Sequence, residues 1–211
     1  MNDLARIVAW GAAALVPPHC AGCDAPGAWL CLACRDACDA EDVPRIGLPV
    51  RAAGTYAGPL RTAIHRYKYR GEPGLAAELG DLVASLLAAD LARGARVDVI
   101  VPVPLHPRRV RERGYDQTAL LAERVASRTD VPLRTALRRV RHLRPQIELD
   151  RPERLRNVSG AFAGVSGSLR GTAVALVDDV VTTGATLRET ARAARRCGAR
   201  RVRAYAVAHD E

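Results

Sequence analysis

Two adjacent acids, Asp178 and Asp179, follow a short apolar run and precede a loop of small residues. Ionised carboxylates only accept hydrogen bonds and sugar hydroxyls can donate them, so paired acids suit a diol such as the ribose 2′- and 3′-hydroxyls. The alternative is an acidic turn that caps the next helix. Capping needs one polar residue, however, and not a pair of acids followed by a phosphate-sized loop. The pair therefore indicates a sugar-binding site.

The loop after the acids can hold a phosphate. Its residues are small, so their backbone N–H groups can wrap around an anion at the start of a helix. They are Thr182, Thr183, Gly184, Ala185 and Thr186. A helix is expected next because Leu187, Ala191 and Ala194 share one face, and Gly198 is placed to end it. Together the acids and the loop predict a site for a phosphorylated sugar.

Elements along the chain alternate between strand and helix patterns, which predicts an α/β fold with a mostly parallel sheet and helices on both faces. Val174–Val177 has the length and β-branching of a buried parallel strand, which places the acids at the carboxyl edge of the sheet. The other expected strands are Val50–Ala57, Val97–Val103 and Val202–Ala208, and the other expected helices are Pro59–Tyr69, Leu75–Leu91 and Tyr115–Ser127.

Only one of the 32 Lys and Arg residues is a lysine, Lys68. A lone lysine in so arginine-rich a chain fits a position that needs a compact ammonium, such as one beside a diphosphate oxygen. Chance retention explains the composition equally well. Gly71 nearby adds a tight turn that could expose the side chain to a ligand.

The net charge of +9 is concentrated in two segments, one with four arginines and one acid at Arg108–Arg113 and one with eight arginines and three acids at Arg134–Arg156. Residues 141–158 have turn formers and no clear periodicity, so we expect a long mobile loop that closes over a polyanion. A solvated basic face or a nucleic-acid footprint would give the same composition.

Four cysteines near the N-terminus have the spacing of zinc ligands, in two Cys-x-x-Cys pairs: Cys20, Cys23, Cys31 and Cys34. Such pairs place four thiolates around a tetrahedral ion, and a full shell implies a structural Zn²⁺. His19 or Cys38 could replace one ligand. A disulfide framework is the competing interpretation, and it is disfavoured because we expect no export. Cys197 is expected to be a small buried residue.

The first residues imitate a signal peptide only loosely. Asp3 lies where a basic region is required, no Ala-x-Ala-like cleavage site follows, and His19 is too large for a lipoprotein cleavage box. We therefore expect a short docking helix with one face made of Leu4, Ile7, Val8, Gly11 and Leu15. We also expect a cytoplasmic protein and no membrane insertion, since no apolar stretch is long enough to span a bilayer. The cysteines stop near Pro44, which predicts an N-terminal helix and zinc module over 1–45 and a second domain over 46–211.

At the acids and the loop the chain resembles the type I phosphoribosyltransferases, which bind 5-phosphoribosyl-1-diphosphate (PRPP) with Mg²⁺. Further segments resemble the ComF/GntX family: Tyr-Lys-Tyr-Arg-Gly, Val101–Gln117, Pro145–Phe162 and the four-cysteine module. The likeness covers nearly the whole chain in order. It departs at Asp116, where the family usually has Asn, and in the short gap between the cysteine pairs.

The resemblance implies a phosphoribosyltransferase-like domain with an N-terminal zinc finger, linked in some members to competence and uptake of single-stranded DNA. Asp178 and Asp179 would then bind the ribose and stabilise a cation-like transition state, and residues 182–186 would bind the 5′-phosphate. Residues 105–109 would form the diphosphate loop, with Lys68, Arg108 and Arg113 as contacts. His106 is expected to be a hydrogen-bonding loop residue in preference to a general base.

Three hypotheses follow: a phosphoribosyltransferase, a PRPP sensor without turnover, and a competence accessory protein that binds single-stranded DNA or a helicase partner. The third has little support from base-stacking aromatics, since only three tyrosines lie near the basic segments. The sequence leaves the acceptor and the oligomeric state open.

Overall fold

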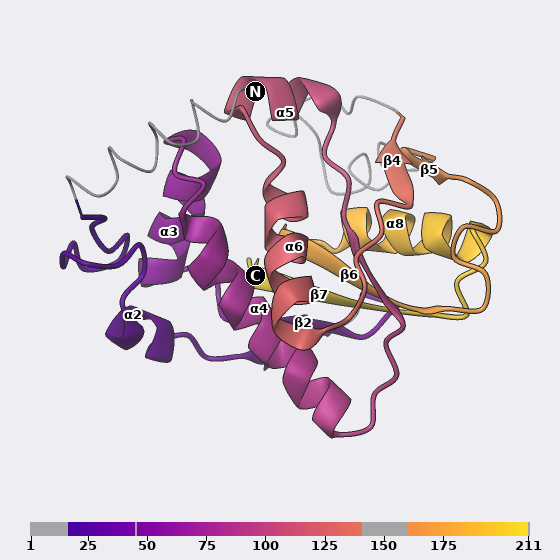
Figure 1. Ribbon diagram of the computed structural model, residues 1–211, viewed down its shortest axis with the longest axis horizontal. Helices are drawn as coiled ribbons and strands as arrows, with labels where there is room; N and C mark the ends of the chain where they lie inside the picture. Colours follow the sequence, from indigo (N-terminus) through magenta and orange to yellow (C-terminus); the bar gives the residue numbers. More distant parts are fainter. Residues whose placement is uncertain (1–16, 45, 141–159, 211) are drawn as a thin grey trace.

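The structure is a computed structural model, and it describes residues 17–44, 46–140 and 160–210. Its main element is a five-stranded sheet with the order β1-β2-β7-β6-β3 (Figure 1). The strands are β1 (Glu41–Asp42), β2 (Val50–Ala52), β3 (Val99–Pro102), β6 (Ala173–Val181) and β7 (Arg201–His209). All neighbours are parallel except β1 and β2. This confirms the predicted α/β class.

Helices cover both faces of the sheet, which explains why its strands read as continuous apolar runs. Alternate strand residues such as Ala175 and Val177 pack in one cluster with α3 (Gly58–Tyr69), α4 (Leu75–Ala92) and α6 (Gln117–Thr129). Their neighbours Val174 and Leu176 pack in the other cluster with α8 (Ala185–Arg196). A two-stranded ribbon of β4 (Leu137–Arg139) and β5 (Phe162–Gly164) lies beside α8 (Figure 1).

Most predicted elements are confirmed with small shifts of their ends. The strand predicted at residues 50–57 is shorter, because after β2 the chain bends at Gly54, whose absent side chain admits Leu60 and Cys38. The strand before the acids is longer than predicted and continues through them to Val181. The predicted N-terminal helix and the predicted mobile loop at 141–158 lie outside the described residues.

The cysteine-rich segment packs against the helical layer, around the short helix α2 (Leu32–Asp36). Trp29 lies against Gly74 just before α4, and any side chain at residue 74 would overlap the indole ring. The chain enters the sheet through β1, which lies just before Pro44, and β2, which follows it. The domain boundary near residue 45 stays a prediction.

No helix among the described residues is long and apolar enough to cross a membrane.

Candidate functional site

The two acids lie on β6 at the point where its neighbour β3 has ended. The β3–β6 ladder runs from Val99 opposite Val174 to Pro102 opposite Val177, so Asp178 and Asp179 are the first residues beyond it. Both are largely buried, with exposed fractions of 8% and 7%, and the backbone N–H of Asp179 donates to Asp178 Oδ1 at 2.9 Å. The carboxyl edge therefore carries two carboxyl groups that are shielded from bulk water.

Lys68 is brought to these acids from a distant part of the sequence. It lies in the last turn of α3, and its Nζ is 2.9 Å from Asp179 Oδ1, with both side chains mostly buried. Its neighbour Tyr67 is fully buried and donates its hydroxyl to the Gln117 carbonyl at 2.8 Å, while the Tyr115 hydroxyl donates to the Tyr67 carbonyl. These bonds tie the end of α3 to the start of α6 and so position Lys68.

The two buried carboxyl groups repel each other when both are ionised, so binding of a proton or a cation is favoured. Burial, and then the neighbouring charge of Asp179, raise the pKa of Asp178 to about 8. The Asp179 N–H, Lys68 and Arg139 oppose the shift without cancelling it. A ligand that brings hydroxyl donors or a cation to this edge would therefore relieve an unfavourable buried charge.

The loop after β6 opens helix α8, as its sequence predicts. Gly184 has φ 67° and caps the N-terminus of α8, in the left-handed region that glycine adopts at little cost. A side chain there would also overlap Ile46, which packs directly on the glycine. Arg188 donates to the Thr183 carbonyl at 3.0 Å, which holds the loop against the first turns of α8.

The segment predicted as a diphosphate loop, Leu105–Arg109, is a loop only before Pro107, and its role at a diphosphate stays a prediction. Helix α5 (Pro107–Arg113) begins inside it, because Pro107 suits the first turn and His106 Nδ1 accepts from the Arg108 N–H at 3.2 Å. His106 is thus a hydrogen-bonding cap, as expected. Cys197 is buried, as expected.

The three predicted diphosphate contacts differ in their surroundings. Lys68 is at the acids, as described above. Arg113 lies over the Tyr69 ring at 5.1 Å, so it reaches the same end of α3. Arg108 is exposed and its Nε is 2.7 Å from Glu112 Oε1, on the surface of α5. The structure therefore brings Lys68 to the acids and Arg113 to Tyr69, the residue after Lys68. Arg108 pairs with Glu112 instead.

Sequence reasoning missed Arg139 on β4. Its guanidinium lies over the Phe162 ring at 5.5 Å, and its buried Nε has no hydrogen-bond partner among the described residues. Burial, and then the charge of Arg109, lower its pKa, while Asp178 opposes this. Arg139 is thus a partly desolvated cation whose charge interacts with a proposed ligand acid and with Arg109 of α5. One arginine among so many carried no signal in the sequence.

The four predicted zinc ligands converge. The Sγ atoms of Cys20, Cys23, Cys31 and Cys34 all lie within 4.8 Å of one another, and those of Cys23 and Cys31 are 3.6 Å apart. Four thiolates at 2.3 Å around a tetrahedral zinc would be about 3.8 Å apart. All six cysteines are free, so the disulfide alternative has no support. The cluster can hold a zinc ion.

Backbone donors complete this cluster. Burial opposes ionisation of Cys20, but the N–H groups of Cys31 and Gly22 at 3.3 and 3.4 Å help lower its pKa to about 6. Residue 22 must be glycine, because a Cβ there would be 2.7 Å from Cys34 Sγ. The two substitute ligands are directed elsewhere: His19 bonds to the Asp24 carbonyl, and Cys38 donates to the Cys34 carbonyl.

Comparison with known proteins agrees with this geometry. Residues 117–211 match the family described as phosphoribosyl transferase domain. Competence protein F of Haemophilus influenzae is 33% identical over 161 residues, which cover 74% of this chain and 70% of that protein. The chain belongs to the ComF family. DNA utilization protein YhgH of Escherichia coli K12 is 34% identical, and the match covers 72% of this chain and 68% of that protein. Competence protein ComFC of Bacillus subtilis is 32% identical, and the match covers 67% of this chain and 56% of that protein.

Membership of the ComF family accounts for the combination of features in one chain. A phosphoribosyltransferase-type sheet carries the acids and the loop, and a four-cysteine cluster precedes it. The names of the relatives connect the family to competence and DNA utilization.

Proposed function

We propose that this chain binds PRPP with Mg²⁺ at the carboxyl edge of the sheet and transfers the phosphoribosyl group or senses it. The observation that carries the proposal is the buried contact between Lys68 and the acid pair, directly before the Gly184 loop. A sugar with phosphates at both ends requires a cation for the diphosphate, acceptors for the two hydroxyls and a loop that binds the other phosphate. The site offers all three.

In this proposal the protein's own groups bind and orient the ligand. Asp178 and Asp179 accept hydrogen bonds from the two ribose hydroxyls, and Thr182–Thr186 turn backbone N–H groups and hydroxyls toward the 5′-phosphate. Lys68 and Arg113 approach the diphosphate from the end of α3 and from α5. Bound Mg²⁺ would neutralise diphosphate charge. The acids and their unfavourable buried charge fit a ligand that brings such a cation.

The acids also suit a transfer reaction. Departure of diphosphate leaves positive charge on the ribose ring, and carboxylates held in a water-poor site stabilise that charge more than they would in water. A PRPP sensor would use the same contacts without an acceptor. Diphosphate release from PRPP with a panel of nucleobases and amines distinguishes transferase from sensor.

Calorimetry with PRPP and MgCl₂ tests the binding site. Asp178→Asn with Asp179→Asn should weaken binding by tenfold or more, because amides are weaker acceptors than carboxylates and attract no cation. The matched control is Asp36→Asn with Asp39→Asn, two exposed acids of the cysteine-rich segment. Unchanged affinity in the first variant, with a thermal midpoint like the wild type, would show that the ligand does not bind here.

A structural zinc in the cysteine cluster, a cytoplasmic location and a link to DNA uptake belong to the same proposal. The zinc is supported by the convergence of the four thiols, and the link to DNA uptake by the competence and DNA utilization names of the relatives. The cytoplasmic location stays a prediction from the sequence. A helicase partner stays a prediction of the family resemblance.

A further inference from the structure

An arginine-rich hollow lies at the amino edge of the sheet, where β6 and β7 begin. Its volume is about 620 Å³ and its walls come from the turn after α4, the last turn of α8 and the first residues of the two strands. Asp178, by contrast, lies five residues along β6 from Ala173, or roughly 16 Å at 3.3 Å per residue. The hollow is therefore separate from the proposed phosphoribosyl site.

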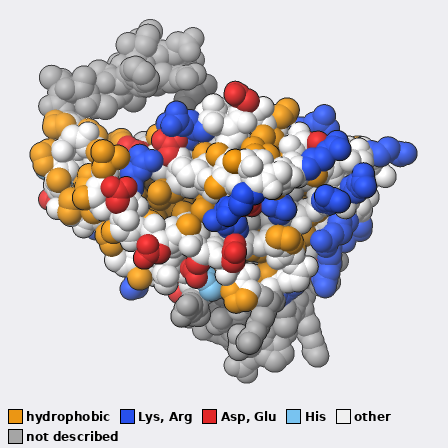
Figure 2. Space-filling view, turned by 90° about the horizontal axis from the view of Figure 1, so that it is seen from below, with side chains coloured by type: hydrophobic (Ala, Val, Ile, Leu, Met, Phe, Trp, Pro, Cys, Tyr) orange, Lys and Arg blue, Asp and Glu red, His pale blue; other side chains and the backbone are white. Residues whose placement is uncertain are grey.

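Positive charge dominates this hollow. Its lining contains one acid, Asp90, and six arginines: Arg93, Arg96, Arg195, Arg200, Arg201 and Arg203. A second hollow of about 330 Å³ adjoins it, shares Asp90, Arg93 and Arg203 with it, and adds Arg51 and Asp42. Basic side chains gather toward the right-hand end in Figure 2, the end where Figure 1 places the loops that lead into β6 and β7.

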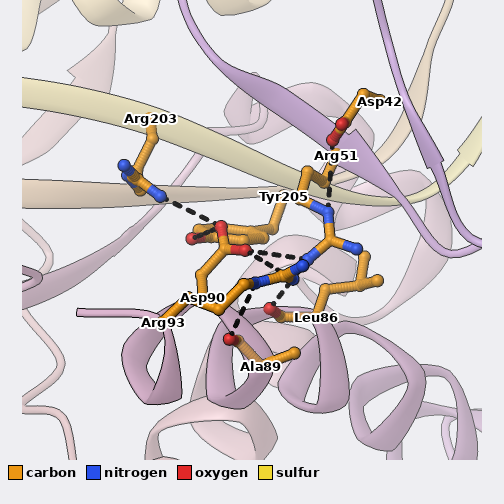
Figure 3. Close-up of polar contacts among 8 residues, drawn as sticks. All are labelled: Asp42, Arg51, Leu86, Ala89, Asp90, Arg93, Arg203 and Tyr205. Carbon is orange, nitrogen blue, oxygen red and sulfur yellow. Dashed lines mark hydrogen bonds and ion pairs between the residues drawn. The ribbon is translucent and has the colours of Figure 1, made fainter. Parts of the chain in front are cut away.

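Asp90 holds a cluster of arginines in place, and Asp42 also pairs with Arg51, at 3.3 Å (Figure 3). Asp90 accepts from Arg51 at 2.8 Å, from Arg203 at 3.0 Å and from Arg93 at 3.2 Å, and also from the Tyr205 hydroxyl at 2.8 Å. Three guanidinium groups thus surround one carboxylate that is mostly buried. These bonds fix the arginines in place and leave a net positive charge, so little conformational freedom is lost on binding an anion.

Three further arginines of the lining have no acidic partner among the described residues. Arg195, Arg200 and Arg201 are exposed, and no carboxylate of the described residues lies within ion-pair distance of them. Exposed arginines normally find partners or spread apart, because like charges that converge on one hollow repel one another. An anionic ligand would remove that repulsion, and guanidinium groups bind phosphate oxygens in bidentate fashion.

We propose that this hollow, together with its smaller neighbour, is a binding site for the phosphate backbone of nucleic acid. The arginines extend from β2 across the start of β7 to the end of α8, which suits a linear polyanion more than a single small anion. None of the residues that line either hollow is aromatic. The site therefore holds phosphates and does not stack bases, and it binds with little sequence preference.

None of the described residues that line the two hollows belongs to the segments at 108–113 and 134–156 that the sequence marked as the main basic regions. It goes beyond the proposed PRPP function and does not depend on it. A chain with both sites could hold a nucleic-acid strand at one edge of the sheet while PRPP is bound at the other.

Fluorescence anisotropy tests the site with a labelled 20-nucleotide oligo-dT and a labelled 20-base-pair duplex over 50–300 mM NaCl. The test variant is Arg195→Gln, Arg200→Gln and Arg201→Gln together. The control is Arg61→Gln, Arg70→Gln and Arg111→Gln, which removes the same charge from exposed positions on α3, beside it and on α5. The two probes show whether the backbone is taken from a single strand or a duplex.

For whichever probe the wild type binds, the affinity of the test variant should be at least about tenfold lower than that of the wild type at 100 mM NaCl. The slope of log K against log[NaCl] should fall by about 2 if three contacts to a single strand are lost. The control should stay within about threefold of the wild type, oligo-dC should bind like oligo-dT, and PRPP affinity should be the same in all three proteins. Equal losses in test and control variants, a strong base preference, or no binding of either probe by the wild type would overturn the proposal.

Discussion

Lys68 Nζ lies 2.9 Å from Asp179 Oδ1, although the two residues are more than a hundred positions apart in the sequence. The ligand-free chain therefore pairs the proposed diphosphate cation with a proposed ribose acid. When a sugar hydroxyl donates to Asp179 instead, the ammonium becomes available for a phosphate oxygen. Before the ligand binds, the ion pair gives both Lys68 and Asp179 an opposite charge, so neither is buried without a partner.

Replacement of Lys68 should therefore affect both stability and binding. Lys68→Met leaves two buried acids without their ammonium, and we expect the free energy of unfolding to fall by roughly 1–3 kcal/mol at pH 8. The loss should be smaller at pH 5, because Asp178 is then protonated. Urea unfolding at the two pH values measures this. Arg70→Met, two residues along and exposed, is the control, and an equal effect of both substitutions would contradict the role of the ion pair.

Asp178→Asn should stabilise the ligand-free protein at high pH. The pKa of Asp178 is raised to about 8 in the folded chain, above its usual value of 3.8, so the folded state keeps a proton that the unfolded state loses. The stability that this proton contributes is complete below about pH 4 and is lost as the pH rises to 8. The asparagine variant avoids the buried charge at pH 9, where we expect a gain on the order of a few kcal/mol.

Thermal midpoints measured from pH 4 to pH 9 without PRPP and Mg²⁺ check this expectation. The midpoints of the variant and of the wild type should be equal near pH 4 and separate progressively above it. A constant difference at every pH would mean that the substitution acts through packing and not through the buried carboxylate.

Gly184→Ala should be more harmful than an ordinary glycine replacement. The left-handed backbone costs a residue with a side chain roughly 1–2 kcal/mol, and the new methyl group must also displace Ile46. Gly94→Ala is a matched control, because Gly94 has φ 84° but no neighbour within 4 Å of a Cβ. We expect Gly184→Ala to lose at least about 1 kcal/mol more in urea unfolding and to weaken PRPP binding. Equal losses would show that Ile46 gives way freely.

Arg139→Leu should weaken PRPP binding by about tenfold, because a desolvated cation near Asp178 is lost. Arg138→Leu is the control on the exposed face of the same strand. Calorimetry compares the two. If the substitutions have the same effect, Arg139 serves only to pack against Phe162.

The sequence predicted the parts of the site that share one segment and missed those that depend on packing between segments. The acids, the loop and the cysteine pairs were visible because spacing along the chain sets their chemistry. The contact of Lys68 with Asp179 required α3 and β6 to meet, and lysine scarcity only hinted at it. Arg139 and the basic hollow could not be singled out, because each arginine looks alike in the sequence and only burial and partners distinguish them.

Removal of zinc should loosen the cysteine cluster more than the sheet. The four Sγ atoms lie within 4.8 Å of one another, and Cys34 and Cys20 are buried among residues that pack on α3 and α4. Without an ion, close thiols would lose the bonds that hold the two turns together.

Elemental analysis should find about one zinc per chain in the wild type and in Cys38→Ser, but much less in Cys34→Ser. Hydrogen exchange after chelation should accelerate at residues 20–38 while β6 and β7 stay protected. A purified wild type without zinc, or equal zinc content in the two serine variants, would show that the cluster is not a zinc site.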